Sequence, residues 1–363
     1  MDVGLVLMGH HGSWDDALYA ESRGFHTAGF VDSPLIAADP FVAMTLAAER
    51  TSTLRVGTML AIPSNRNATA LVTAIGTVNR LAPGRAFLGI GSGFTGRAVF
   101  GLKALSVERF AAYVAQCRTL MAGGEVVHED GAESRPIRLR HVASRYVDCA
   151  EVPVYVAADG PRALGLAGQL GDGWITSLQR SHMMGNSAAV FADSLELVRQ
   201  AAAAAGRPQH PGYTMASAGF CVLEEGESAL SERALEHVGP YAMLGFHAYA
   251  DNPLLADHLP PPFQERLDIY KERVLARFDV PSDRLYQEVH RGHLSHLLER
   301  EEEVLTEEIV RMTTLTGTAE EIAVVLRNLE QAGLRNMTLN PPPHLVRQAV
   351  DDYAEKIAPL LAH

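Results

Sequence analysis

The chain has 363 residues, of which 47% are hydrophobic and 20% are charged, as in an ordinary globular protein with a large core. Its formal net charge of −12 disfavours nonspecific binding to nucleic acid or to anionic membranes. Cys117, Cys149 and Cys221 are far apart and form no C-x-x-C pair, which argues against a disulfide framework or a cysteine zinc site. Neither a signal peptide nor a run of membrane-spanning length is recognisable. We therefore expect a cytoplasmic protein with no nucleic-acid or membrane partner.

Short apolar runs alternate with amphipathic segments along most of the chain. The expected strands are 3–8, 26–32, 54–62, 85–91, 153–158, 173–178, 213–224 and 336–341. The expected helices are 13–25, 39–51, 67–81, 106–123, 161–171, 187–205 and 318–333. Residues 124–151 are a polar excursion between two of these units.

Capping residues support several of the helix starts. Ser13 is a candidate N-cap for the first helix. Asp39 precedes Pro40, which suits the first position of a helix. Thr318 and Glu321 have the spacing of a capping box.

About eight β/α units over this length predict a TIM barrel, (β/α)₈, with a parallel sheet covered by helices. The charged, helical residues of about 226–315 interrupt the alternation before the last strand. Proline-rich breaks at 260–262 and 281–283 separate the helices of this stretch. We interpret it as an insertion into the barrel, so that residues 1–363 form a single domain.

The sequence "FLGIGSGFTGR" at 87–97 contains G-x-G-x-x-G after an expected strand. A Rossmann phosphate loop would follow the first strand and open a helix at once, whereas this loop follows the fourth strand and we expect the next helix only near Ser106. In a barrel the same glycines would lie on the C-terminal face, where their N–H groups can surround a phosphate. Gly91, Ser92 and Gly93 are therefore candidate phosphate ligands, with a simple tight turn as the alternative.

A second candidate anion site follows the fifth expected strand. Its residues are Ala157, Ala158, Asp159, Gly160 and Pro161. Pro161 suits the first position of a helix, whose unpaired N–H groups and positive dipole end attract anions. Two such loops on one face of a barrel favour a phosphorylated cofactor.

Polar residues after the first two strands are candidates for the chemistry. Asp32 and Ser33 end the second strand and should face the same mouth, where they could bind the cofactor or substrate or, alternatively, cap the next turn. His10 and His11 follow the first strand, and an imidazole suits proton transfer near neutral pH. We take His10, His11 and Asp32 as candidate catalytic residues.

Three further histidines occur in the insertion. We expect His290, His293 and His296 on one broad helical face, where three rings on one helix converge poorly on a metal ion. The familiar i, i+4 pairing is absent. We therefore predict no metal site and assign His290 and His293 to the substrate pocket.

Three stretches together resemble the bacterial-luciferase-like flavin and deazaflavin oxidoreductases. They are "LRVGTMLAIPSNRNATALVTAIGTVNRLAPGRAFLGIGSG", "VPVYVAADGPRALGLAGQLGDGWITS" and "TGTAEEIAVVLRNLEQAG". The order and spacing are most similar to the branch of methylenetetrahydromethanopterin reductase. The segment "HRGHLSHLLERE" at 290–301 is also similar to a H-E-G-H segment of relatives.

The resemblance implies a TIM barrel, usually a homodimer, that binds FMN or the deazaflavin coenzyme F-420 at the C-terminal face. It implies a bulge at Met59, Leu60 and Ala61, often with a non-prolyl cis peptide, behind the cofactor ring. The usual T-N-P is replaced here by Ala61-Ile62-Pro63, and the usual acidic-His pair by Asp32-Ser33. The A-x-G-P-[KR] form of 158–162 is similar to the deazaflavin users.

We therefore expect an F-420-dependent oxidoreductase that transfers a hydride to or from a small organic substrate. An FMN-dependent monooxygenase of the same family is the first alternative. A barrel that binds flavin without catalysis is the second.

Overall fold

The computed structural model describes residues 1–149, 151–179 and 187–362. Eight parallel strands close into a barrel in the order β1-β12-β9-β8-β7-β4-β3-β2. Their bounds are β1 Asp2–Leu7, β2 Thr27–Phe30, β3 Arg55–Ala61, β4 Ala86–Ile90, β7 Val154–Ala157, β8 Gly173–Ser177, β9 Tyr213–Ala218 and β12 Asn336–Leu339. This closed parallel sheet confirms the predicted TIM barrel.

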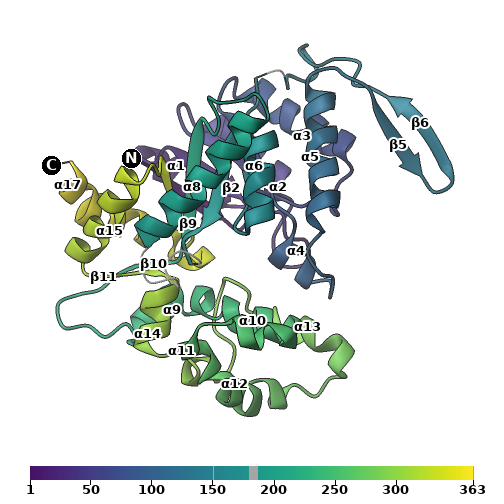
Figure 1. The fold of residues 1–363 in the computed structure, drawn as a ribbon. Coiled ribbons are helices and arrows are strands. Elements are labelled where there is room, and N and C mark those ends of the chain that lie inside the picture. Colours follow the sequence, from purple (N-terminus) through teal and green to yellow (C-terminus); the bar gives the residue numbers. More distant parts are fainter. Residues whose placement is uncertain (150, 180–186, 363) are drawn as a thin grey trace.

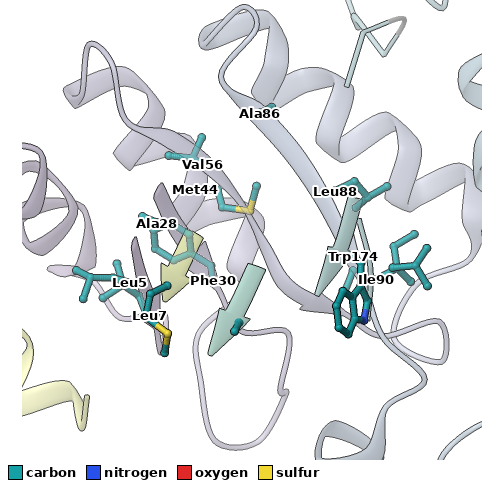
Figure 2. Packing of buried hydrophobic residues seen from close by; sticks show 14 of the residues in the cluster. Leu5, Leu7, Ala28, Phe30, Met44, Val56, Ala86, Leu88, Ile90 and Trp174 are labelled. Atoms are coloured by element: carbon teal, nitrogen blue, oxygen red, sulfur yellow. The ribbon is translucent and has the colours of Figure 1, made fainter. Parts of the chain in front are cut away.

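Helices cover the outside of the barrel (Figure 1). They are α1 Ser13–Ser22, α2 Pro40–Arg50, α3 Ala68–Leu81, α5 Val107–Met121, α6 Pro161–Leu170, α8 Ser187–Ala204, α15 Ala319–Gln331 and α16 Val346–Asp352. The outward side chains of the strands pack against them in one large apolar core; Figure 2 shows Leu88, Ile90 and Trp174 in it. Because the strands are covered on this face and filled inside, most of their residues are apolar.

Most predicted helix starts are confirmed. The Asp39 side chain accepts hydrogen bonds from the first N–H groups of α2, and Pro40 is its first residue. Thr318 and Glu321 form the predicted capping box of α15. The prediction for Ser13 is wrong, because Gly12 is the N-cap and the Ser13 hydroxyl instead donates to the carbonyl of His10 at 2.8 Å.

The bottom of the barrel is closed by a polar plug. The Arg55 guanidinium donates to the Tyr155 hydroxyl at 2.5 Å and lies 4.9 Å from the centre of the Tyr213 ring. The Tyr213 hydroxyl donates to Asp2, and the Asn336 amide donates to that hydroxyl at 3.3 Å. These residues lie at the N-terminal ends of their strands, which in TIM barrels serve stability and leave the other end for the active site.

The insertion follows β9, the seventh barrel strand, as predicted. It begins at β10 Phe220–Val222 and ends at β11 Leu315–Gly317, which pair in parallel outside the barrel. Between them lie α9 Glu232–Ala242, α10 Leu244–Asp251, α11 Pro261–Gln264, α12 Leu267–Arg273, α13 Leu285–Val289 and α14 Glu307–Thr313. These helices enclose an apolar core of their own.

Two elements differ from expectation. The single strand expected over 213–224 is interrupted at Gly219, where a Cβ would come within 2.9 Å of Tyr241, and its second part leaves the barrel as β10. The polar excursion contains a hairpin of β5 Val126–Asp130 and β6 Glu133–Ile137, which projects from the barrel (Figure 1).

Candidate active site

The expected cofactor residues lie at the C-terminal ends of neighbouring strands. In register, Leu7 of β1 pairs with Phe30 of β2, and Phe30 pairs with Thr58 of β3. Ala61 of β3 then pairs with Ile90 of β4, and Ile90 pairs with Val156 of β7. The loops after these five strands therefore form one continuous arc of the barrel rim.

The end of β3 has the bulge that the resemblance implied. The register with β4 shifts between Thr58 and Ala61, and the peptide bond between Met59 and Leu60 is cis. Glycines on the neighbouring strands make room for these side chains. A Cβ on Gly29 of β2 would meet Met59 at 2.0 Å, and a Cβ on Gly91 would meet Leu60 at 2.6 Å.

The β4 loop continues this surface. The N–H of Gly91 donates to the carbonyl of Ala61 at 3.1 Å, and the carbonyl of Ser92 accepts from the N–H of Leu105 at 3.0 Å. Gly93 has φ +85°, a conformation that favours glycine, and caps the short helix α4 Phe94–Ala98. The expectation that no helix begins before Ser106 is thus wrong, although Ser106 does cap α5. The Rossmann alternative is excluded because the loop follows a strand of a closed barrel.

The β7 loop ends in the predicted helix start. Pro161 is the first residue of α6, and Gly160 is its N-cap with no side-chain cap. A Cβ on Gly160 would meet nothing within 4 Å. The carboxylate of Asp159 accepts from the Thr176 hydroxyl of β8 at 2.5 Å, and the carbonyl of Ala158 accepts from the indole of Trp174 at 2.8 Å. The loop is thereby tied to β8, while Gly160 borders open space.

Two arginines that the sequence interpretation did not single out lie beside these loops. A Cβ on Gly93 would come within 2.7 Å of the Arg97 side chain, which donates to the carbonyl of Lys103. Arg162, in the first turn of α6, forms an ion pair with Glu108 of α5. The sequence could have identified both arginines, because each follows closely after one of the two candidate phosphate loops. Arg97 adds positive charge to an edge of the rim that already carries a helix N-terminus, whereas the charge of Arg162 is balanced by Glu108.

Asp32 is buried and fully engaged. Its carboxylate accepts from the N–H of Ile62 at 3.1 Å and pairs with Arg66 at 2.9 Å, while its carbonyl accepts from the amide of Asn65 at 3.0 Å. Arg66 also pairs with Asp39. Asp32 thus holds the segment that follows the β3 bulge. The neighbouring Ser33 is half-buried, and its carbonyl accepts from the N–H of Ala37.

His10 and His11 lie in the β1 loop, with their rings edge-on and 5.8 Å apart. The Nδ1 of His10 accepts from the N–H of Gly12 at 3.1 Å, and its Nε2 lies 3.3 Å from Asp16. The Gly12 contact assigns the ring proton to Nε2, where Asp16 accepts it. His11 is exposed, which leaves it better placed than His10 to exchange protons.

The prediction of a helix through the histidine segment of the insertion is wrong. His290 follows α13 as its C-cap, and residues 291–295 form turns, with Leu294 at φ 56°. His290 and His293 are buried, and they cluster with His247 of α10 and not with His296, which is exposed. Their placement in the substrate pocket stays a prediction.

The insertion contacts the rim on more than one side. The Tyr241 hydroxyl of α9 lies 3.2 Å from the Ser177 hydroxyl of β8 and donates to the carbonyl of Ser217 of β9. On the other side, a Cβ on Gly101 after α4 would meet the ring of Tyr286 of α13 at 2.8 Å. Figure 1 shows the insertion on the side of the barrel from which α4 projects. It therefore spans the C-terminal face.

A hollow with a volume of about 310 Å³ lies inside the insertion, between Val274, Phe278, Arg291 and Leu298. None of the expected cofactor residues lines it. Among the described residues, no helix is both long enough and apolar enough to cross a membrane.

Among curated proteins, the chain is similar to 5,10-methylenetetrahydromethanopterin reductase of Methanolobus tindarius, with 29% identity over 167 residues, or 43% of this chain and 47% of that protein. It is 34% identical to F-420-dependent glucose-6-phosphate dehydrogenase of Mycolicibacterium fortuitum over 173 residues, or 45% of this chain and 48% of that protein. The matched segments thus span about half the length of these relatives.

Similar solved structures cover nearly the whole chain. A coenzyme F-420-dependent tetrahydromethanopterin reductase from Methanopyrus kandleri matches with a TM-score of 0.68 and 15% identity, over 99% of both chains. The oxygenating constituent of 3,6-diketocamphane monooxygenase from Pseudomonas putida, in complex with FMN, matches with a TM-score of 0.63 and 15% identity, over 99% of this chain and 98% of that one. At this identity the likeness shows the fold. The sequence pattern of the luciferase-like monooxygenases matches residues 14–336, and the chain therefore belongs to that family.

Proposed function

We propose that this protein is a coenzyme F-420-dependent oxidoreductase that transfers a hydride between the deazaflavin and a small organic substrate. The observation that carries the proposal is the continuous arc of cofactor candidates at the ends of β2, β3, β4 and β7. The F-420-dependent glucose-6-phosphate dehydrogenase among the relatives and the F-420-dependent tetrahydromethanopterin reductase among the similar structures support the deazaflavin.

The phosphate end of the cofactor fits the β7 loop. The first N–H groups of α6 have no partner within the helix, and Gly160 leaves the approach to them open. The carboxylate of Asp159 is turned to Thr176 of β8, which keeps its negative charge engaged there. Ser92 and Gly93, which follow the adjacent strand β4, and the nearby Arg97 would complete the anion site, whereas the N–H of Gly91 already donates to Ala61.

The ring end fits the bulge of β3. Met59 and Ala61 are buried, whereas Leu60 is half-buried at the rim. Asp32 and Arg66 hold the chain that follows the bulge, so the surface offered to the ring is fixed in advance. Asp32 acts in this proposal as a positioning residue, and Ser33 remains at the mouth beside it.

When bound, the deazaflavin supplies the hydride chemistry, and the protein supplies position and electrostatics. The exposed His11 is our candidate for proton exchange with the substrate. The neighbouring ring of His10 is oriented by its hydrogen bonds with Gly12 and Asp16. The insertion would cover the mouth and exclude water, held by Tyr241 on one side and Tyr286 on the other. We expect a homodimer that acts on a small-molecule substrate in the cytoplasm.

An FMN-dependent monooxygenase is the second candidate. The description of the family and the FMN complex of a structural neighbour favour it. Both cofactors carry phosphate, so the β7 loop suits either. Oxygen consumption with reduced FMN would distinguish the two, and the absence of turnover with either reduced cofactor would support a binding protein without catalysis.

The phosphate site can be tested without disturbing the fold. Gly160→Val places a side chain in open space at the expected phosphate position, and we expect the dissociation constant of F-420 to rise at least tenfold, or about 1.4 kcal/mol. Gly165→Ala, also in open space but one turn further along α6, is the matched control and should bind F-420 like the unmodified protein. Equal affinity in all three proteins would move the phosphate elsewhere. Gly91 and Gly93 are poorer targets because side chains there would displace Leu60 or Arg97.

A further inference from the structure

Three buried histidines meet inside the insertion. His247 lies on α10, His290 ends α13, and His293 lies in the turn that follows. One ring nitrogen of each lies within 4.8 Å of those of the other two. The three residues are only 3–4% exposed. The cluster is outside the arc of cofactor candidates, and the role proposed for it here replaces both the expected substrate-pocket role of His290 and His293 and the expected absence of a metal site.

Carboxylates fix the tautomers of two of these rings. The Nε2 of His247 lies 2.7 Å from Glu301, and the Nε2 of His290 lies 2.9 Å from Asp251. An ionised carboxylate only accepts hydrogen bonds, so each Nε2 carries the proton that it donates. In a neutral ring the other nitrogen, Nδ1, then has a free lone pair.

These lone pairs have nothing to bind within the protein. Among the described residues, the Nδ1 atoms of His247, His290 and His293 are all buried without a hydrogen-bond partner. Buried acceptors without donors are costly, and three of them together call for a shared positive centre.

We propose that His247, His290 and His293 bind a divalent zinc ion through their free ring nitrogens. Three neutral imidazoles are a common zinc ligand set. Histidine ligands typically donate their other N–H to a carboxylate, as His247 does to Glu301 and His290 to Asp251. Zn–N bonds of about 2.0–2.1 Å would bring the ring nitrogens closer together than the limit of 4.8 Å within which they lie now.

The ion would join parts of the insertion that are distant in sequence. It would link α10 to the turn after α13, and through Glu301 and Asp251 it would order the 3₁₀-helix Glu301–Glu303 and the end of α10. Tyr286, one turn before His290, contacts Gly101 on the barrel rim. Zinc, with water as its fourth ligand, would therefore stiffen the element that spans the C-terminal face.

The direct test is metal binding by the full chain, produced without a histidine tag and stripped with a chelator. Zinc is added, the excess is removed, and the bound metal is measured by mass spectrometry. We expect about one zinc per chain, and cobalt added in its place should give the visible absorption of a low-symmetry, nitrogen-bound site. Neither measurement needs a variant.

Substitutions test whether the bound zinc lies at the three histidines. His293→Gln and His247→Gln should each lower zinc affinity at least a hundredfold, and Glu301→Gln should lower it by about 10–100-fold. His296→Gln is the matched control, because His296 is exposed in the same segment and lies outside the cluster. Less than a tenth of an equivalent of zinc in the unmodified protein would overturn the proposal, and so would unchanged affinity in the His293 and His247 variants. Because F-420 is absent from these assays, the result is independent of the proposed function.

Discussion

Asp32 is a carboxylate at the rim that is buried and held by hydrogen bonds. It is 2% exposed, and both its oxygens have partners, in the N–H of Ile62 and the guanidinium of Arg66. Removing its charge would leave Arg66 with only its more exposed partner, Asp39. Its role is therefore to hold the segment after the β3 bulge in place.

We predict that Asp32→Asn lowers the free energy of unfolding by about 2–4 kcal/mol, measured by denaturant titration. The matched control is Asp39→Asn, which touches the same Arg66 from the exposed side and keeps a good N-cap. It should cost less than about 1 kcal/mol. Equal losses in the two variants would contradict the burial argument.

The sequence could indicate Asp32 but not its partner. Asp32 stands out as the acidic residue at the end of an apolar strand. Arg66 lies 34 positions later, and nothing in the local pattern shows that the β3 bulge turns it back toward β2. The same holds for His247, which joins His290 and His293 from another helix.

At the scale of elements, glycines decide how closely neighbours pack. Gly168 of α6 lies against the backbone of α8, where a Cβ would come within 2.2 Å of the carbonyl of Val198. Gly165, on the same helix, would have nothing within 4 Å of its Cβ. The two positions therefore respond to the same substitution in opposite ways.

We predict that Gly168→Ala lowers the thermal midpoint of unfolding, with a cost of about 2–3 kcal/mol, because the backbone of α8 would have to move. Gly165→Ala should raise stability by up to about 1 kcal/mol, since alanine is the better helix former. Differential scanning calorimetry of both variants tests the pair. A neutral Gly168→Ala would show that α6 and α8 can separate freely.

Element boundaries were predictable where local chemistry sets them. The predicted starts of α2 and α15 are confirmed, and they rest on Asp39 with Pro40 and on Thr318 with Glu321. Long-range packing set the boundaries that were missed. The strand expected over 213–224 is interrupted at Gly219, where the backbone packs closely against Tyr241 of the insertion. At Gly292 the chain turns back on itself, so that a Cβ there would meet the carbonyl of His296 at 2.4 Å, which suits a turn and not the expected helix.

At the scale of the whole molecule, three buried thiols report on the integrity of the fold. Cys117 and Cys149 lie in the barrel core and Cys221 in that of the insertion, and all three are free. Burial raises the pKa of Cys117 and of Cys221 to about 12 and that of Cys149 to about 11. They are therefore protonated at pH 8, where only the thiolate reacts quickly.

We predict that the native protein does not react with a thiol reagent at pH 8 within the time in which the denatured protein reacts fully. Mass spectrometry of alkylated peptides should show Cys221 modified first if the insertion opens before the barrel. Rapid labelling of Cys117 or Cys149 in the native state would contradict the packing of the barrel.

The barrel could be predicted from the alternation of eight β/α units, and the insertion from the break in that alternation. The path of the insertion across the rim could not be predicted, because it depends on contacts such as those of Tyr241 with Ser177 and of Tyr286 with Gly101. Each contact joins two segments that are distant in the sequence, and nothing in a single sequence indicates that they meet.

The central claim is that the arc of loops binds a deazaflavin. The most direct measurement is a parallel titration of the purified protein with coenzyme F-420 and with FMN, followed by absorbance and fluorescence. We predict saturable binding of F-420 at least tenfold tighter than that of FMN. Tighter binding of FMN would contradict the account and favour the monooxygenase, and binding of neither would show that the arc holds another ligand.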